Sequence, residues 1–366
     1  MTLYPNLILD ALRTVRYPGN GKNIVELGMV EDDMRIDGSK VSFSLIFDRP
    51  TDPFIKSVVR AAEAAILAHV SDDVDIKGNI AVKTRHANPP SKPNPLPKVK
   101  NIIGISSGKG GVGKSTVAAN LAVALAREGY KVGLLDADIF GPSVPTMFGV
   151  ENQPLYMHNV DGRDLIIPLE RYGVKLLSIG FLVNTDDAIL WRGAMATRAL
   201  HDLIEKADWG ELDYFLIDMP PGTSDIHLTL VQTLGITGVV IVSTPQEVAL
   251  ADARRGVAMF TGEKVNVPVL GIVENMSWFT PEAHPDERYY IFGNGGAARL
   301  AETMHVPLLA QIPLVAAVGI NSDKGTPVAL GDTLSAQSFF HLAHEVTDAV
   351  ERRNSSLPPT TKVEVK

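Results

Sequence analysis

One short run of glycine, lysine and hydroxyl residues has the composition to bind phosphate. It consists of Gly108, Lys109, Gly110, Gly111, Val112, Gly113, Lys114, Ser115 and Thr116. The run fits G-x-x-x-x-G-K-[ST] and carries an additional lysine, Lys109, near its start. Its glycines let backbone N–H groups curl around phosphate oxygens. We expect Lys114 to neutralise the β- and γ-phosphates and the Ser115 hydroxyl to bind Mg²⁺.

The residues on either side of the run supply the structural context that it needs. An apolar segment of strand length, residues 101–106, precedes it, and an Ala/Leu-rich segment, residues 117–125, follows it. A strand, a glycine loop and a helix in this order place the phosphates at the helix N-terminus, where the helix dipole is positive. The sequence therefore predicts a nucleotide-binding loop at 108–116.

Three carboxylates follow other apolar segments and could serve the bound nucleotide. Asp136 and Asp138 come directly after the run 130–135, and Asp218 comes after the run 214–217. Ligand sites in open α/β sheets gather at such strand ends. We expect Asp136 and Asp218 to hold Mg²⁺, directly or through water, and Asp138 to position the attacking water in catalysis with Lys114. A solvated acidic turn is the alternative for the pair Asp136 and Asp138.

The turn after Asp218 contains a glycine that could respond to hydrolysis. Gly222 lies within residues 219–225 and could offer its backbone N–H to the γ-phosphate. Because glycine changes its backbone conformation easily, the sequence predicts a switch at this turn.

The apolar runs predict the architecture that brings these residues together. Runs at 130–135, 214–217, 238–243 and 267–273 are nearly continuous, as in strands that are buried on both faces. With helices between them they indicate an α/β fold with a doubly wound, mostly parallel sheet. We expect this nucleotide-binding domain to span residues 100–353, with a disordered tail at 354–366.

A separate small α/β domain is expected at residues 1–85. Helices are predicted at 5–14 and 53–70 and a half-buried strand at 41–47. The proline-rich segment 86–99 that follows disfavours both helix and sheet, so it is predicted to be a linker.

Composition narrows the range of functions. The 366 residues carry a formal net charge of -8, which disfavours a broad nucleic-acid-binding surface, and they include no cysteine. The sequence shows no apolar run of membrane-spanning length and no signal-peptide pattern, so we expect a cytoplasmic protein without a membrane partner. The absence of cysteine removes thiol nucleophiles and thiolate metal ligands.

The motifs together resemble those of the Mrp/ApbC-type P-loop ATPases, a family of iron–sulfur cluster carriers. The segments that carry the resemblance are 108–116, DADIFGPS at 136–143, WRGAM at 191–195, DMPPGTSD at 218–225 and NMS at 275–277. The resemblance covers residues 98–350, and the N-terminal residues are similar to the small domain that often precedes this ATPase. It implies binding and hydrolysis of Mg²⁺-ATP, a homodimer, and apo iron–sulfur proteins or assembly factors as partners.

Two further residues take a role from the resemblance alone. Lys109 corresponds to the signature lysine of the deviant Walker A loop, which reaches the nucleotide of the opposite subunit; a plain surface lysine is the alternative. Asn275 corresponds to an asparagine that contacts adenine, and its amide carries both a donor and an acceptor. Arg192 could face the dimer groove or simply begin a helix.

The chain departs from the family at the cysteines that hold the cluster. The family carries a Cys-x-x-Cys pair after the Asn-Met-Ser motif, whereas residues 278–292 here contain neither cysteine. The family thus implies an iron–sulfur cluster that the residues do not support. The leading hypothesis is an assembly ATPase that docks partners through its N-terminal domain and residues 278–292. The alternative is a nucleotide-switched positioning protein of the ParA/MinD type.

Overall fold

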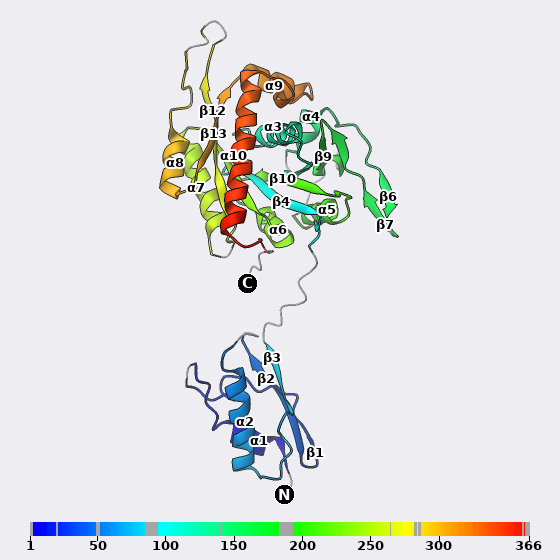
Figure 1. The fold of residues 1–366 in the computed structure, drawn as a ribbon, viewed down its shortest axis with the longest axis vertical. Coiled ribbons are helices and arrows are strands. Elements are labelled where there is room, and N and C mark those ends of the chain that lie inside the picture. The colour runs from blue at the N-terminus through cyan, green and yellow to red at the C-terminus, as the bar shows by residue number, and fades with distance from the viewer. Residues whose placement is uncertain are drawn as a thin grey trace. The chain divides into compact units, whose positions relative to one another are not determined.

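The computed structural model describes residues 3–19, 21–48, 52–84, 94–139, 141–160, 162–182, 193–263, 265–281, 284, 287–360 and 362. The chain forms two compact units, Met1–Pro93 and Asn94–Lys366 (Figure 1). The division falls within the segment that was predicted to be a linker, of which residues 86–93 lie outside the described part.

The smaller unit packs two helices against a three-stranded sheet. Its helices are α1 (Pro5–Leu12) and α2 (Ile55–His69), and its strands are β1 (Arg35–Asp37), β2 (Lys40–Phe47) and β3 (Ile80–Thr84). The order is β1-β2-β3, with β2 antiparallel to β1 and parallel to β3. Alternate residues of β2, including Val41 and Phe43, are buried against the helices.

The larger unit contains an eight-stranded sheet in the order β13-β12-β11-β4-β10-β5-β9-β8. The strands are β4 (Val99–Ser107), β5 (Val132–Asp136), β8 (Leu169–Arg171), β9 (Val174–Ser178), β10 (Leu212–Pro221), β11 (Gly238–Ser243), β12 (Val269–Phe279) and β13 (Leu308–Leu314). All neighbouring pairs are parallel except β8 with β9. The predicted mostly parallel sheet is confirmed.

Helices cover both faces of this sheet and bury a separate apolar core on each. They are α3 (Lys114–Arg127), α4 (Val144–Phe148), α5 (Gly193–Glu205), α6 (Asp225–Thr233), α7 (Glu247–Thr261), α8 (Gly296–Met304), α9 (Ala316–Asp323) and α10 (Leu334–Ser356). Helix α3 lies on one face with α10, and α5 to α8 pack with the core of the other face. The predicted doubly wound arrangement is therefore also confirmed.

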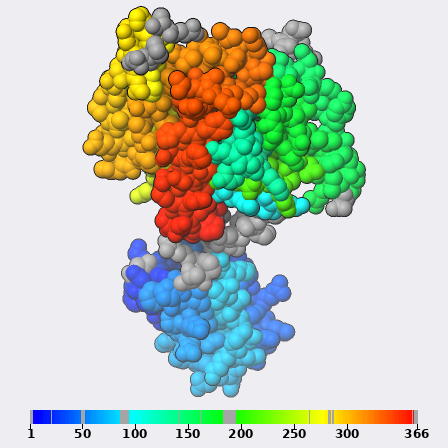
Figure 2. All heavy atoms as spheres, turned by 45° about the horizontal axis from the view of Figure 1, so that its top comes forward, coloured from blue at the N-terminus to red at the C-terminus, as the bar shows by residue number. Residues whose placement is uncertain are grey.

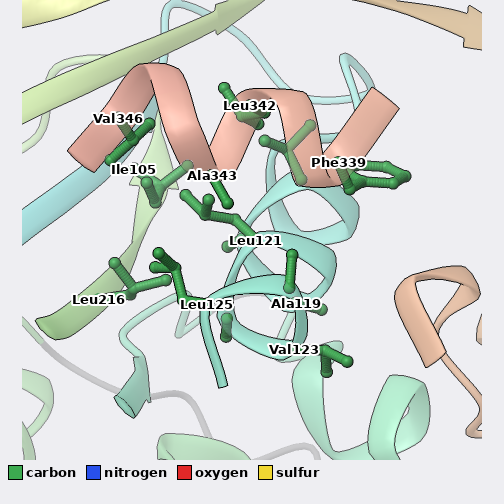
Figure 3. Packing of buried hydrophobic residues seen from close by; sticks show 14 of the residues in the cluster. Ile105, Ala119, Leu121, Val123, Leu125, Leu216, Phe339, Leu342, Ala343 and Val346 are labelled. Atoms are coloured by element: carbon green, nitrogen blue, oxygen red, sulfur yellow. The ribbon is translucent and has the colours of Figure 1, made fainter. Parts of the chain in front are cut away.

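Helix α3, which begins in the phosphate-binding loop, is buried on all sides. Every residue from Val117 to Leu125 is buried, and Leu121 and Leu125 fill the space between α10 and the sheet (Figure 3). The outer side of α10 forms part of the surface of the larger unit (Figure 2). Small alanine side chains allow α3 to pack this closely against the strands.

The end of the chain differs from the prediction. The sequence predicted a disordered tail from residue 354, but α10 continues to Ser356. The Arg353 guanidinium also donates to the Pro358 carbonyl at 2.7 Å and to the Thr360 hydroxyl at 2.8 Å. The predicted start of the tail was therefore too early, since residues 354–356 belong to α10. Of the last six residues, only Lys362 belongs to the described chain.

A short hairpin outside the large sheet had no counterpart in the predictions. It consists of β6 (Met157–Val160) and β7 (Arg163–Ile166).

Of the helices in the described ranges, none combines the length and the apolar character of a membrane span.

Candidate functional site

The glycine-rich loop joins the carboxyl end of β4 to the N-terminus of α3. Gly111 and Gly113 have φ values of 82° and 80°, in the left-handed region that favours glycine. The loop encloses a pocket of about 220 Å³, lined by Ser107, Lys109, Gly110, Gly111, Val112, Gly113, Lys114, Ser115, Thr116, Asp138, Ser143, Met147 and Pro221. Every predicted loop residue except Gly108 therefore lines one cavity at the N-terminus of α3.

Gly108 holds the start of the loop against another helix. A Cβ atom at this position would lie 2.1 Å from the backbone carbon of Asp252 in α7, which no side chain can tolerate. Glycine is thus required here for close approach of two backbones.

Lys114 makes the central contacts of the site. Its side chain is 6% exposed, and its ammonium donates to Asp218 Oδ1 at 2.5 Å and to the Ser115 hydroxyl at 3.2 Å. The Asp138 carboxylate lies 3.8 Å away. One buried cation is therefore shared by two carboxylates from different strand ends, and it faces the pocket that the loop encloses.

The site contains buried carboxylate oxygens without partners. Asp218 Oδ2 and Asp138 Oδ1 make no hydrogen bond within the described structure. Burial raises the pKa of Asp218, and the neighbouring Lys114 opposes that rise. An unpartnered carboxylate oxygen next to a serine hydroxyl suits a small hard cation, so Asp218 and Ser115 fit Mg²⁺, and Asp138 Oδ1 is free to orient a water molecule.

Asp136 is placed differently from Asp138. Its Oδ1 accepts from the Asp138 N–H at 3.1 Å, and its Oδ2 accepts from the Val144 N–H at 3.2 Å and the Ser178 hydroxyl at 2.9 Å. Burial and the nearby Asp218 raise its pKa to about 7. These bonds tie the loop after β5 to β9 and α4. Because both oxygens have partners, Asp136 can act on a metal only through intervening groups or after losing a bond.

Asn275 also contacts the loop, although it lies on β12, which β11 separates from β4 in the sheet. Its side-chain amide donates to the Val112 carbonyl at 2.8 Å, and it approaches the position that a Cβ atom of Gly113 would occupy. The register of β12 against β13 shifts directly after Asn275. Such an irregularity turns a side chain out of the regular ladder toward the site.

Lys109 is partly exposed at the edge of the pocket. Its backbone carbonyl accepts from the Ser107 hydroxyl at 2.9 Å. Within the described ranges its ammonium has neither a hydrogen bond nor an ion pair, in contrast to Lys114. The two loop lysines therefore have different surroundings.

Gly222 lies beside the loop, but its N–H is occupied. It has a φ of 79° and donates to the Ser107 carbonyl at the end of β4, at 2.9 Å. The register of β10 against β4 shifts between Asp218 and Pro221, so one additional residue of β10 lies in this turn.

Several residues of the site were not predicted. Ser143 and Met147 line the pocket beside Pro221, and Ser178 holds Asp136. Ser178 is the last residue of β9, as Asp136 is the last residue of β5. The short apolar segment before Ser178 is the feature of the sequence that could have indicated this strand end. Arg192 lies outside the described residues, so its predicted role remains a prediction.

Comparison with known proteins identifies the family to which this chain belongs. A family model described as NUBPL iron-transfer P-loop NTPase matches residues 98–347, more than half of the chain. The chain belongs to this family. A second model, described as iron-sulfur cluster assembly protein, matches residues 6–77 of the smaller unit.

Relatives of similar length support the family assignment. An iron-sulfur cluster carrier protein from Synechocystis is 41% identical over 354 residues, covering 95% of this chain and 98% of the relative. One from Escherichia coli is 51% identical over 278 residues, covering 76% and 72%. The predicted membership of an iron–sulfur cluster carrier family is confirmed.

Solved structures agree with the fold of the larger unit. A nucleotide-binding protein from Archaeoglobus fulgidus in complex with ADP is 39% identical, with a TM-score of 0.57, and the match covers 67% of this chain and 92% of that one. The septum site-determining protein MinD from Pyrococcus horikoshii, complexed with Mg-ADP, is 25% identical with a TM-score of 0.51, covering 69% and 98%. The ParA/MinD alternative thus reflects a relation in fold.

Proposed function

We propose that the larger unit binds and hydrolyses Mg²⁺-ATP, and that hydrolysis serves the handling of iron–sulfur clusters for apoprotein clients or assembly factors. The observation that carries the proposal is the buried Lys114 beside the glycine loop, paired with Asp218 and lying near Asp138. A buried cation, unpartnered carboxylate oxygens and backbone N–H groups at a helix N-terminus together suit a triphosphate.

Each residue has a distinct part in the proposed reaction. Loop N–H groups and Lys114 bind the phosphates, and Asp138 orients the attacking water through its unpartnered oxygen. Ser115 and Asp218 are the residues that would hold Mg²⁺, while Asp136 accepts the Asp138 and Val144 N–H groups and so fixes the loop after β5. A bound Mg²⁺ would neutralise charge that develops on the phosphate oxygens.

The proposed active form is a homodimer with Lys109 acting across its interface. The partly exposed Lys109 lies at the rim of the pocket without an ionic partner among the described residues. A cation placed there could stabilise the transition state of a facing subunit, as an arginine finger does. Asn275 is proposed to contact adenine after releasing the Val112 carbonyl.

Asp138→Ala tests the hydrolysis proposal. We expect the variant to bind ATP with nearly unchanged affinity and to hydrolyse it about 100-fold more slowly, because only the positioning of water is lost. Calorimetry measures binding and phosphate release measures turnover. Asp202→Ala removes an acidic residue of α5 that pairs with Lys206 and does not line the pocket, and it serves as the control. Wild-type turnover by Asp138→Ala would contradict the assignment.

The cluster itself does not fit the residues of this chain. The full sequence has no cysteine, and the described residues include no group of three or more His, Asp or Glu side chains able to hold a metal. Where the family cysteines are expected, Phe279 pairs with Tyr289 through backbone bonds of 2.9 and 2.8 Å, and Arg288 stacks on Trp278. We propose that this partly exposed aromatic segment binds a partner protein rather than a cluster.

Anaerobic reconstitution with iron and sulfide tests this part of the proposal. We expect no stoichiometric cluster to accompany the protein through gel filtration, since soft iron–sulfide ligation needs thiolates that are absent. A relative that carries the cysteines, treated in parallel, is the positive control. Cluster absorbance that co-elutes with this protein in stoichiometric amount would refute the proposal.

A further inference from the structure

The buried carboxylate of Glu274 has no part in the proposed reaction. It belongs to β12, directly before Asn275, and it is 0% exposed. Its partners among the described residues are uncharged donors, so hydrogen bonds must compensate for the water that its oxygens lose on burial. Because such a group is costly to bury, its position beside Asn275 calls for an explanation.

Three donors meet the Glu274 carboxylate. Its Oε1 accepts from the Ser277 hydroxyl at 2.5 Å and from the Gln311 side-chain amide at 2.7 Å. Its Oε2 accepts from the Ala297 N–H at 2.8 Å, in the first turn of α8, where the helix dipole favours a negative charge. Gln311 is the register partner of Glu274 on β13. The carboxylate therefore ties β13, α8 and the chain after Asn275 to one point of β12.

The chain between Glu274 and Ser277 makes an unusual turn. Met276 has a φ of 55°, in the left-handed region that residues other than glycine seldom adopt. Such a conformation persists only where the surrounding structure holds it. The Ser277 hydroxyl bonds back to Glu274 across this residue, and the register of β12 against β13 shifts at the same place. The carboxylate of Glu274 thus closes the turn around Met276.

The turn directs two neighbouring side chains to the phosphate-binding loop. In a regular strand, consecutive side chains point to opposite faces of the sheet. Here a Cβ atom on Gly113 would lie 2.3 Å from Asn275 Nδ2 and 3.6 Å from the terminal methyl carbon of Met276. Asn275 also donates to the Val112 carbonyl at 2.8 Å. The left-handed backbone of Met276 accounts for this joint approach to the loop.

We infer that Glu274 is a positioning residue for nucleotide binding, which holds the Asn275 amide beside the phosphate-binding loop through its bond to Ser277. The bonds from β13 and α8 fix the carboxylate itself. Glu274 does not line the pocket, so it acts on a nucleotide only through Asn275. The inference rests on the proposed ATP binding by this loop.

A double-mutant cycle on ATP affinity, measured by calorimetry, tests the inference. Glu274→Met keeps an unbranched side chain of similar length but leaves the three donors without this acceptor, and it should weaken ATP binding about tenfold. Asn275→Ala should cause a similar loss. If Glu274 acts through Asn275, the double variant should bind ATP about tenfold more weakly than the wild type. Losses that multiply to about 100-fold would overturn the inference.

A conservative variant and a matched control accompany the cycle. Glu274→Gln keeps an acceptor for the Ala297 N–H and can bond Gln311 through its amide, so it should recover most of the affinity lost in Glu274→Met. An equal loss in both variants would count against positioning by hydrogen bonds. Glu302→Met makes the same change at an exposed position of α8 that does not line the pocket, and it should bind ATP as the wild type does.

Ser277→Ala applies if Glu274→Met fails to fold. It removes only the hydroxyl that closes the turn, and it should weaken ATP binding about threefold, with no further loss in the Asn275→Ala background. Unchanged affinity in Ser277→Ala, or the same loss in the Asn275→Ala background, would refute the role of Glu274. Failure of the unaltered protein to bind ATP would refute the proposed function instead.

Discussion

Lys114→Ala is expected to weaken ATP binding by about 100-fold or more, the equivalent of a lost charge-assisted hydrogen bond to phosphate. The variant also leaves Asp218 buried without the ammonium that it contacts at 2.5 Å. Removal of one partner from a buried ion pair is strongly destabilising. The change should therefore lower thermal stability in the absence of nucleotide as well.

The loss of stability should depend on pH. Burial raises the pKa of Asp218, and Lys114 opposes this rise in the folded protein. Without Lys114 the folded-state pKa lies further above the unfolded value, so folding favours the protonated carboxyl. The free energy of unfolding of Lys114→Ala should thus fall, relative to the wild type, as the pH rises from about 5 to about 8.

Calorimetric titration with ATP and thermal unfolding at both pH values measure these effects. Lys131→Ala removes an exposed lysine that pairs with Glu211 on the surface, and it should change neither quantity appreciably. Wild-type ATP affinity in Lys114→Ala would show that the loop does not bind phosphate in the proposed way.

Lys109→Ala should reduce turnover by about 1000-fold with little effect on ATP binding, if the lysine acts as a finger across the dimer. Mixing this variant with Asp138→Ala tests action in trans. In a mixed dimer, the Lys109→Ala subunit keeps its aspartate and receives the intact lysine of the other subunit. Random mixing should then restore about a quarter of the active sites.

Each variant alone is the control for the mixing experiment and should remain inactive. Differently tagged subunits allow mixed dimers to be isolated before phosphate release is measured. If purified mixed dimers remain as inactive as the parents, Lys109 acts on its own subunit or not at all.

Apolar runs in the sequence were sufficient to predict many of the strands of the larger unit. The segment 238–243 was predicted as a buried strand and forms β11 with the same limits, because an uninterrupted apolar run fits a strand covered on both faces. Strand β10 extends from Leu212 to Pro221, well beyond the predicted 214–217. Polar residues at a strand end weaken the apolar pattern while backbone pairing continues, so the sequence underestimates length there.

The sequence predicted where the site residues lie better than it predicted the hydrogen-bond partners of their side chains. Asp136 and Asp138 were predicted as a pair with related roles, but only Asp138 lines the pocket. Asp136 points to Ser178 and the Val144 N–H, partners that depend on how β9 and α4 pack. Likewise, the contact of Asn275 with the Val112 carbonyl joins residues far apart in the chain. Such long-range hydrogen bonds leave no periodic signal.

The burial of residues 117–125 in α3 has a consequence for how the protein opens. Backbone amides from Val117 to Leu125 can exchange their hydrogen with solvent only when the whole larger unit unfolds, whereas the turn around Gly222 can open by breaking a few local bonds. We therefore expect the phosphate site to lie between a strongly protected helix and a turn whose amides exchange more readily.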